Sequence, residues 1–481
     1  MAGGPWLRAS PGRLSVASLC RKASKSIWSS RPRAAGSLRR DRKSRNGKQG
    51  GAHLLERSGP RREILSTRWL VVLGLGILAH AAWLISPAAA QEAGGEPKPT
   101  KPVEWKNGLQ FQSDDGNYQF RIGGYLQADG NFYLDDSQEL ATDTFQIRRA
   151  RLVLEGSFWK RFDFRVSPDF GLGKTTLFDA YIDLKFNEAF KLRTGKAKAP
   201  LGLERLQSAT NLTLVERALP TNLVPARDVG VQAQGELRHG AVAYAAGVFN
   251  GVPDLVNGDS DTDDGKDGAA RIFARPFKNS SRAGLQGLGL GVAGSFGNAE
   301  GALASYKTTG QVTYFKYLTL SEADGRRTRI NPQAYYYVGP FGLMTEYVQS
   351  AQEIRNGAAR QEIRNRAYMG TASWVISGDK VSYEGVVPEK PLGPKDGGLG
   401  ALQLAWRYSA LRVDDAAFPT FADPDASPRR AGAWGLGVNW FLNYNVRLSL
   451  QYEWTKFLGG AAAGGDREDE KALFLRLQIR T

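Results

Sequence analysis

The sequence predicts an all-β protein, a transmembrane antiparallel up-and-down β-barrel of about sixteen strands over residues 110–481. In the last segment of the chain, two sets of residues alternate: Leu473, Leu475, Leu477 and Ile479 against Ala472, Phe474, Arg476, Gln478 and Arg480. Side chains of a strand point alternately to its two faces, so one face here is apolar and the other carries arginines. After Gln91 no apolar stretch is long enough for a membrane-spanning helix. A membrane protein without such helices has to be a closed barrel, because lipid cannot satisfy the polar groups of open sheet edges.

The first 90 residues are predicted to be a leader that is removed from the mature protein. Arg61, Arg62 and Arg68 precede an apolar core over residues 69–85, and the small residues around 88–90 form a cleavage signal. A basic region, an apolar core and such a signal together indicate a secretory signal peptide cleaved near 90/91. A membrane anchor is the alternative, since the apolar core lies at the short end of spanning length. Residues 91–109 are predicted to form a short segment ahead of the barrel.

The net charge of +16 belongs mainly to that leader. Residues 1–90 hold 17 Lys and Arg against 3 Asp and Glu, whereas residues 91–481 hold 47 against 45. A basic surface for nucleic acid is therefore not predicted for the mature protein, and no nucleic-acid partner is expected. The one cysteine, Cys20, also lies in the leader. The absence of thiols after it suits an exported protein without a disulfide framework.

Similar alternation predicts strands throughout the chain. The apolar faces of the clearest examples are Leu152, Leu154 and Phe158; Phe178, Ala180, Ile182, Leu184 and Phe186; Ala372, Trp374 and Ile376; Leu402, Leu404, Trp406 and Tyr408; and Val446, Leu448, Leu450, Tyr452 and Trp454. Aromatic pairs near strand ends predict the girdles that barrels place at membrane interfaces: Phe158 and Trp159, Trp440 and Phe441, Trp454 and Phe457. A soluble sandwich would also alternate, but without so many aromatic residues on the apolar face.

Short and long connections alternate between the predicted strands. Tight turns are predicted at 159–161, 187–188, 238–240, 339–340 and 443–445. Longer polar loops are predicted near 199–228, 250–267, 350–363, 410–431 and 458–469. Such an arrangement is typical of bacterial outer-membrane barrels, which have an even number of strands. Seventeen segments qualify as strands, so sixteen are predicted, and the weakest candidates are 309–318 and 380–398.

By the same alternation, eleven arginines face the interior of the barrel: Arg121, Arg149, Arg151, Arg165, Arg193, Arg271, Arg275, Arg407, Arg447, Arg476 and Arg480. Seven carboxylates face it as well: Asp129, Glu155, Asp163, Asp179, Asp183, Glu346 and Glu453. Guanidinium groups stay charged and present a planar fork of donors that matches phosphate or carboxylate. A surplus of such cations attracts anions, provided that binding is weak enough for release. The alternative is that each arginine pairs with a carboxylate and only stiffens the wall.

The loop at residues 199–228 is the predicted constriction of the channel. It carries Arg205, Arg217, Arg227 and Asp228 between several prolines. A loop of this length without secondary structure of its own is uncommon unless it has a function. The alternative is an outer flap that makes no contact with the channel.

Candidate catalytic residues are scarce after the leader. His239 is the only histidine there and lies in the predicted turn 238–240, and no set of His and Cys residues could hold a metal. Barrel hydrolases place a histidine base beside a serine or a carboxylate. An enzyme is therefore not predicted, and neither is a cofactor or a metal. A structural or adhesive barrel is disfavoured as well, because no large extracellular domain is visible.

Six segments of the chain resemble the phosphate-selective porin O and P family. They are FQIRRARLVLEGS (145–157), GKAKAPLGLER (195–205), ERALPTNLVPARDVG (216–230), RIFARPF (271–277), NPQAYYYVGPFG (331–342) and LNYNVR (442–447). This resemblance covers roughly residues 110–481. It implies a sixteen-stranded trimeric porin of a Gram-negative outer membrane, with an arginine-lined pore for phosphate or related anions. It also implies an inward-folded third loop that constricts the channel.

Two features depart from the pattern of that family. The chain ends in Arg480 and Thr481 rather than in an aromatic residue, and the face comparable to the family's arginine stack reads Arg271, Phe273, Arg275. We expect an anion-selective diffusion channel for phosphate or polyphosphate, with a general, weakly selective porin as the alternative. The expected partners are inorganic phosphate or other small anions, outer-membrane lipid and the other subunits of a homotrimer.

Overall fold

The computed structural model of the protein describes residues 104–105, 108–261, 263–393 and 397–481. The predicted leader, its cleavage site and most of the segment 91–109 lie outside these residues. Within them, none of the helices is both long and apolar enough to cross a membrane. Almost all regular structure in this part of the chain is β-strand.

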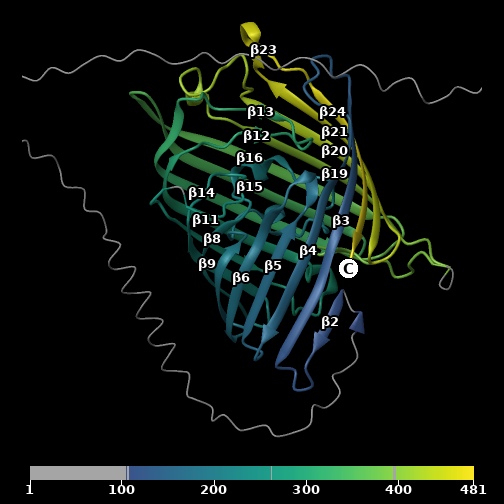
Figure 1. The fold of residues 1–481 in the computed structure, drawn as a ribbon. Coiled ribbons are helices and arrows are strands. Elements are labelled where there is room, and N and C mark those ends of the chain that lie inside the picture. Colours follow the sequence, from purple (N-terminus) through teal and green to yellow (C-terminus); the bar gives the residue numbers. More distant parts are fainter. Residues whose placement is uncertain (1–103, 106–107, 262, 394–396) are drawn as a thin grey trace, which may run out of the picture. The chain divides into compact units, whose positions relative to one another are not determined.

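Sixteen antiparallel strands of the described residues form a closed barrel. They are β3 (Tyr118–Leu134), β4 (Thr144–Phe158), β5 (Phe162–Asp169), β6 (Thr176–Asn187), β7 (Phe190–Ala197), β8 (Asp228–Leu237), β9 (Val242–Phe249), β10 (Asp267–Ala274), β11 (Leu288–Gly301), β14 (Ser321–Val338), β15 (Phe341–Asn356), β16 (Ala359–Val375), β19 (Ala401–Arg412), β20 (Arg430–Phe441), β21 (Val446–Leu458) and β24 (Glu470–Arg480). Each strand pairs with the next, and β24 pairs with β3, as Figure 1 shows in yellow and blue. The predicted fold class and strand number are confirmed.

The remaining elements are short. β1 (Glu104–Trp105) and β2 (Leu109–Gln112) extend the sheet beside β3. Three small hairpins are β12 (Tyr306–Lys307) with β13 (Thr313–Phe315), β17 (Val381–Ser382) with β18 (Gly385–Val386), and β22 (Gly460–Ala461) with β23 (Gly465–Asp466). The helical turns are η1 (Gly171–Gly173), α2 (Leu203–Leu206), η2 (Leu219–Leu223), η3 (Ala283–Leu285), η4 (Asp415–Ala417) and η5 (Ala462–Gly464). The weak segments 309–318 and 380–398 thus belong to connections and not to the barrel wall.

The two ends of the barrel differ in their connections. One end, which we call the turn side, holds the start of β3, the end of β24 and five short connections: 159–161, 188–189, 238–241, 339–340 and 442–445. The other end, which we call the loop side, holds the longer connections 198–227, 250–266, 302–320, 413–429 and 459–469. All five predicted turns and four of the five predicted loops agree with this arrangement.

Two connections differ from the prediction. The predicted loop 350–363 is wrong, because β15 and β16 continue to the tight turn at 357–358, where Asn356 pairs with Ala359. Polarity indicated a loop there, but the tip of a long hairpin needs no apolar face if it extends beyond the lipid. Conversely, the turn side carries a long connection from 376 to 400, which contains β17 and β18; the connection 275–287, which contains η3, lies on this side as well.

Side chains of the wall alternate between the two faces. In β24, Leu475, Leu477 and Ile479 are 43, 41 and 46% exposed, whereas Arg476 and Gln478 are each 2% exposed. The prediction that Phe178 lies on the apolar outer face is wrong. The pairing of β5 with β6 shifts register next to this residue, and such a bulge turns two successive side chains to the same side of the sheet. Phe178 therefore lines the interior instead of the outer face.

The predicted aromatic girdles are also correct only in part. Trp159 and Trp440 are 60 and 38% exposed, as outward-facing residues should be. Phe441 and Phe457 are 7 and 6% exposed and pack inside the barrel. Sequence neighbours in a strand cannot both face lipid, so Phe441 has to point inward where Trp440 points outward.

The connection 198–227 folds into the lumen, and we call it the inserted loop. Several of its apolar side chains pack with loop 302–320 and loop 413–429 in one core, among them Leu201, Leu219, Leu223 and Val224, each at most 2% exposed. The adjoining wall leaves room for the loop, because a Cβ at Gly437 would lie 2.5 Å from Cδ2 of Leu214. The core includes wall residues of β9 to β11, β15, β16 and β19 to β21. We call the part of the lumen that this core fills the packed side, and the part next to β3 to β10 where space remains the open side; β9 and β10 border both.

Candidate functional site

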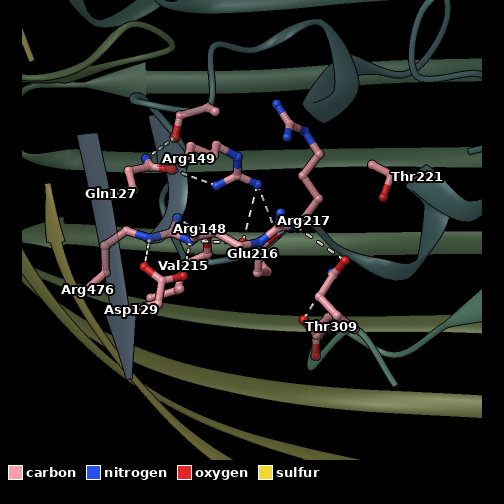
Figure 2. Close-up of polar contacts among 12 residues, drawn as sticks. Gln127, Asp129, Arg148, Arg149, Val215, Glu216, Arg217, Thr221, Thr309 and Arg476 are labelled. Atoms are coloured by element: carbon pink, nitrogen blue, oxygen red, sulfur yellow. Dashed lines mark hydrogen bonds and ion pairs between the residues drawn. The ribbon is translucent and has the colours of Figure 1, made fainter. Parts of the chain in front are cut away.

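Glu216 fixes the inserted loop to two parts of the barrel wall. Its carboxylate accepts hydrogen bonds from Nε of Arg148 (3.0 Å), Nη2 of Arg149 (3.1 Å) and Nη2 of Arg476 (2.8 Å). The first two arginines come from β4, and Arg476, which also pairs with Asp129 at 2.6 Å, comes from β24. Figure 2 shows the three guanidinium groups around this carboxylate. Burial raises the pKa of Glu216, but the three arginines together outweigh burial and hold the pKa well below its usual value.

Two more inward-facing arginines lie beneath the inserted loop. Arg407 donates to the carbonyl of Glu216 at 2.8 Å and pairs with the carboxylate of Glu453 at 3.3 Å. Arg447 donates to a backbone carbonyl of the loop at 2.9 Å. Arg407, Arg447 and Arg476 are only 0, 3 and 2% exposed. These three arginines, which the alternation predicts to line the channel, do face inward, but they anchor the loop instead of meeting the open space.

Arg148 is a residue of the site that the alternation misses. The pairing of β3 with β4 shifts register between Gln127 and Ala128, where β4 passes from Arg149 to Ile147. The extra residue of this bulge is Arg148, whose side chain turns inward to Glu216. A charged side chain on the lipid face of a barrel costs about 2–4 kcal/mol near the bilayer midplane. An arginine at an outward position was therefore the available signal for a bulge.

Most predicted arginines on the open side of the wall pair with carboxylates. The pairs are Arg121 and Arg165 with Glu155, Arg151 with Asp169, and Arg193 with Asp183. Arg151 also lies 3.8 Å from the centre of the Phe178 ring, and Arg193 lies 3.7 Å from that of Tyr181. Such cation–π contacts and ion pairs fix the side chains and offset their charge. These contacts agree with the alternative in which each arginine pairs with a carboxylate and stiffens the wall.

An open cavity of about 680 Å³ lies between the inserted loop and strands β3 to β10. Eleven cationic residues line it: Arg148, Arg149, Arg151, Arg165, Lys191, Arg193, Lys198, Arg205, Arg217, Arg227 and Arg271. Only four carboxylates line it: Asp179, Glu188, Glu236 and Glu384. An anion that enters this cavity therefore meets a surplus of positive charge.

Five of the cations in this cavity make no ion pair within the described part of the chain: Lys191, Lys198, Arg205, Arg217 and Arg271. Lys198 and Arg217 each donate to two backbone carbonyls of the inserted loop, at 2.9 to 3.1 Å. Arg205 donates to the carbonyl of Thr221 at 2.7 Å, and Arg271 to the side-chain oxygen of Gln333 at 2.9 Å. These neutral partners hold the side chains in place without cancelling their charge.

Repulsion among the cations of the inserted loop is visible in their pKa values. Burial, Arg217 and Arg227 lower the pKa of Arg205 to about 9, and its Nε is buried without a hydrogen-bond partner. Burial, Arg227 and Arg217 also lower the pKa of Lys198 well below its usual value. A cluster of mutually repelling cations is stabilised by an anion placed among them, and shifted pKa values of this kind gather at functional sites.

The other predicted residues of the constriction have structural partners. Arg227 pairs with Asp179 at 2.9 Å. The sequence predicts Asp228 in the loop, but it is the first residue of β8 and is 2% exposed. Its carboxylate accepts a hydrogen bond from the N–H of Gly251 at 2.9 Å and so holds the next loop-side connection. Arg275 follows β10 and donates to a backbone carbonyl of the turn 238–241 on the turn side.

The hairpin of β17 and β18 contacts the inserted loop from the turn side, and we call it the turn-side hairpin. The hydroxyl of Tyr383 donates to the carbonyl of Leu203 at 2.6 Å. Nδ2 of Asn211 donates to Oε2 of Glu384 at 3.0 Å. Both hairpin residues line the open cavity. The sequence gives little signal for this insertion, because the segment has no alternation of apolar and polar residues.

Chemistry beyond charge is limited in this site. Among the residues that the structure describes, no group of three or more His, Cys, Asp or Glu side chains is arranged to hold a metal ion. His239 lies in the turn 238–241 on the turn side and does not line the cavity. The arrangement can attract, orient and release anions.

Comparison with known proteins relates the chain to one family. A sequence profile described as "Phosphate-selective porin O and P" matches residues 120–480. Porin O of Pseudomonas aeruginosa is 24% identical over 389 residues, which cover 73% of this chain and 86% of that protein. An uncharacterized protein of Caulobacter vibrioides is 25% identical over 419 residues, 80% of this chain and 79% of that protein. The outer membrane channel DcaP of Acinetobacter baumannii shares the fold, with a TM-score of 0.51 at 12% identity over 77% of this chain and 99% of that chain.

Proposed function

The chain belongs to the phosphate-selective porin O and P family, and on this basis we propose that it forms an anion-selective diffusion channel through the outer membrane of a Gram-negative bacterium. The preferred substrate in this proposal is phosphate or polyphosphate. The observation that carries the proposal is the open cavity, where Lys198, Arg205, Arg217 and Arg271 lack carboxylate partners.

Selection in the proposed channel is electrostatic. Cations fixed in a narrow passage with walls of low dielectric constant concentrate anions and repel other cations. Guanidinium and ammonium groups also donate hydrogen bonds that replace part of the hydration of an oxyanion. The paired arginines of the wall, such as Arg151 with Asp169, moderate the positive potential. Moderation matters because an anion that binds too tightly would not leave the channel.

The inserted loop is the proposed constriction. It occupies the packed side of the lumen and leaves the pathway on the side of β3 to β10. Its anchor at Glu216 involves two parts of the wall, which supports a passage of fixed width. Arg205 and Arg217 are carried by this loop, so the proposed constriction is positively charged.

Orientation in the membrane follows from the connections. In barrels of this kind the short turns face the periplasm and the longer loops face the exterior. The turn side is therefore the periplasmic side, and the inserted loop enters from outside. We also propose a homotrimer and a leader removed near 90/91. Mass spectrometry of the mature N-terminus tests the cleavage, and retention of residues 69–85 would reject it.

A channel without catalytic activity is part of the same proposal. His239, the only histidine after the leader, lies outside the cavity on the periplasmic side. A histidine base at the cavity is therefore missing among the described residues, and barrel hydrolases depend on one.

Recordings on planar bilayers test the function. In a gradient of potassium chloride, the reversal potential should show that chloride passes more readily than potassium. Inorganic phosphate added to a chloride solution should then reduce the chloride current in a saturable way. Strong anion selectivity without competition by phosphate would support a general anion porin instead. Cation preference would reject the proposal.

A further inference from the structure

We propose that Glu384, on the turn-side hairpin, weakens the binding of a permeating anion in the open cavity. Because the cavity is the proposed pathway, this role rests on the proposed function. Glu384 is exposed, lines the cavity and makes no direct ion pair within the described residues, although Arg480 lies near enough to attract it. A carboxylate in a pathway for anions is unfavourable for anion binding, which raises the question of what it does there.

The position of Glu384 is fixed by the inserted loop. Its Oε2 accepts a hydrogen bond from Nδ2 of Asn211 at 3.0 Å. Asn211 is 9% exposed, and its Oδ1 accepts a hydrogen bond from Nη1 of Arg480 at 2.7 Å. The neighbouring Tyr383 stacks on Tyr335 of the wall, with ring centres 5.4 Å apart. The carboxylate is therefore held at the periplasmic face of the same loop that carries the unpaired cations.

The charge of the lumen changes along the pathway. Arg205 belongs to the cationic cluster of the open cavity. It is 9% exposed, and its Nε has no hydrogen-bond partner. A second cavity of about 380 Å³ shares Arg165 and Tyr181 with the first. The charged residues of this second cavity are two cations and three carboxylates: Arg121 and Arg165 with Glu155, Asp163 and Asp183. The residues of this second cavity lie near the turn-side ends of their strands, so the surplus of positive charge ends before the periplasmic mouth.

A negative charge next to a site for anions weakens binding at that site. An anion held by Lys198, Arg205 and Arg217 is attracted by all three, whereas Glu384, which lines the same cavity, repels it and raises the energy of the bound state. A multi-site channel needs such weakening to combine binding with flux. Glu384 thus limits affinity in favour of throughput.

The test is a comparison of single-channel currents for the wild type, Glu384→Gln and Glu384→Lys, with inorganic phosphate as the probe. The amide of Gln keeps an oxygen that can accept the hydrogen bond from Asn211, so the hairpin should stay in place. Phosphate should bind more tightly to Glu384→Gln, with the concentration for half-maximal block of chloride current falling about twofold to tenfold. This is the range that Coulomb's law gives for a unit charge about 10 Å away, with an effective dielectric constant between about 80 and about 25. The effect of Glu384→Lys should be larger in the same direction, and its maximal current should be lower.

Glu389→Gln and Glu389→Lys are the matched controls. Glu389 belongs to the same connection, is exposed and lines neither cavity. Its variants change the net charge equally and should leave phosphate block unchanged. If the wild type is anion-selective but the Glu384 variants behave like the Glu389 variants, the role of Glu384 is rejected while the channel function stands. If the wild type itself shows no preference for anions, the proposed function fails first.

Discussion

Inward-facing cations play different parts on the two sides of this barrel. On the packed side, Arg407, Arg447 and Arg476 lie beneath the inserted loop and bind its carbonyls and carboxylates. On the open side, Lys198 and Arg205 donate only to backbone carbonyls and border a cavity. The chemical groups are similar, yet those on the first side hold the loop and those on the second are available to an anion.

The contrast shows that the partners around a charged group decide its role. A charge removed from water is costly unless an opposite charge and hydrogen bonds replace the lost hydration. Arg476 meets this condition through Asp129 and Glu216. Next to open space, water or a passing anion can serve instead, so Arg217 needs no carboxylate.

The largest expected effect is on the free energy of unfolding, and it distinguishes the packed side from the open side. Arg476→Ala leaves Asp129 and Glu216 buried without one of their cations. We expect a loss of about 3–5 kcal/mol in the free energy of unfolding, the usual range for breaking a buried ion pair. Urea unfolding of the barrel in lipid vesicles measures it. Lys191→Ala, on the open side, is the control and should change stability by less than about 1 kcal/mol. Equal losses for both variants would remove the distinction between the sides.

A second prediction concerns the inner and outer faces of the wall. Leu152 is 36% exposed and faces outward, next to the inward-facing Arg151. Leu152→Arg should cost about 2–4 kcal/mol if the residue lies near the bilayer midplane, and it should impair assembly. Leu152→Met should be well tolerated. The yield of heat-resistant barrel in the outer-membrane fraction measures the effect, and a silent Leu152→Arg variant would invert the faces assigned to β4.

Anion binding should respond to changes on the open side. Arg205→Gln removes an unpaired guanidinium, and a hydrogen bond to a charged group contributes about 1.5–3 kcal/mol. We expect at least a tenfold rise in the phosphate concentration needed for half-maximal block of chloride current. Arg360→Gln, at the exposed tip of the hairpin of β15 and β16, makes the same change in net charge and should have no effect. A similar response to both variants would mean that net charge alone matters.

A smaller effect should appear with pH. Because burial and the neighbouring Arg227 and Arg217 hold the pKa of Lys198 well below its usual value, this residue should lose its proton at a lower pH than an exposed lysine does. The deprotonated form attracts anions less, so chloride selectivity should fall as the pH rises through the pKa of Lys198. Lys198→Arg should reduce this dependence, since arginine normally keeps its proton to a higher pH than lysine. A remaining decline near pH 9 belongs to Arg205, whose pKa is about 9. Reversal potentials in a chloride gradient measure it, and a selectivity that rises with pH would contradict the assignment.

The anchor at Glu216 should not respond to mild acid. Its pKa in the folded protein is depressed, so the stability that it contributes is fully present above the unfolded pKa of about 4.3. That stability is lost only as the pH falls through the lower pKa of the folded state. Single-channel conductance should therefore show no release of the inserted loop between pH 8 and pH 5.

The sequence predicts the fold well because alternation in a strand is a local property. Leu475 and Arg476 differ in exposure as their positions require. Bulges are a property of two strands together, so the inward turn of Phe178 could not be predicted from its strand alone, whereas at Arg148 a charge at an outward position is a local signal for the bulge. The same limit applies to the site. Alternation places Arg407 inside the barrel, but only the folded loop shows that Glu216 and its neighbours cover it. The turn-side hairpin has no periodicity at all, and Glu384 was missed for that reason.

The central claim is that the cations of the open side select the anion. Reversal potentials in a gradient of potassium chloride, for the wild type and for a variant combining Lys198→Gln, Arg205→Gln and Arg217→Gln, test it most directly. The variant should still assemble, because none of the three residues pairs with a carboxylate. We expect strong preference for chloride in the wild type and loss of most of that preference in the variant. An assembled variant that keeps the selectivity of the wild type would contradict the claim.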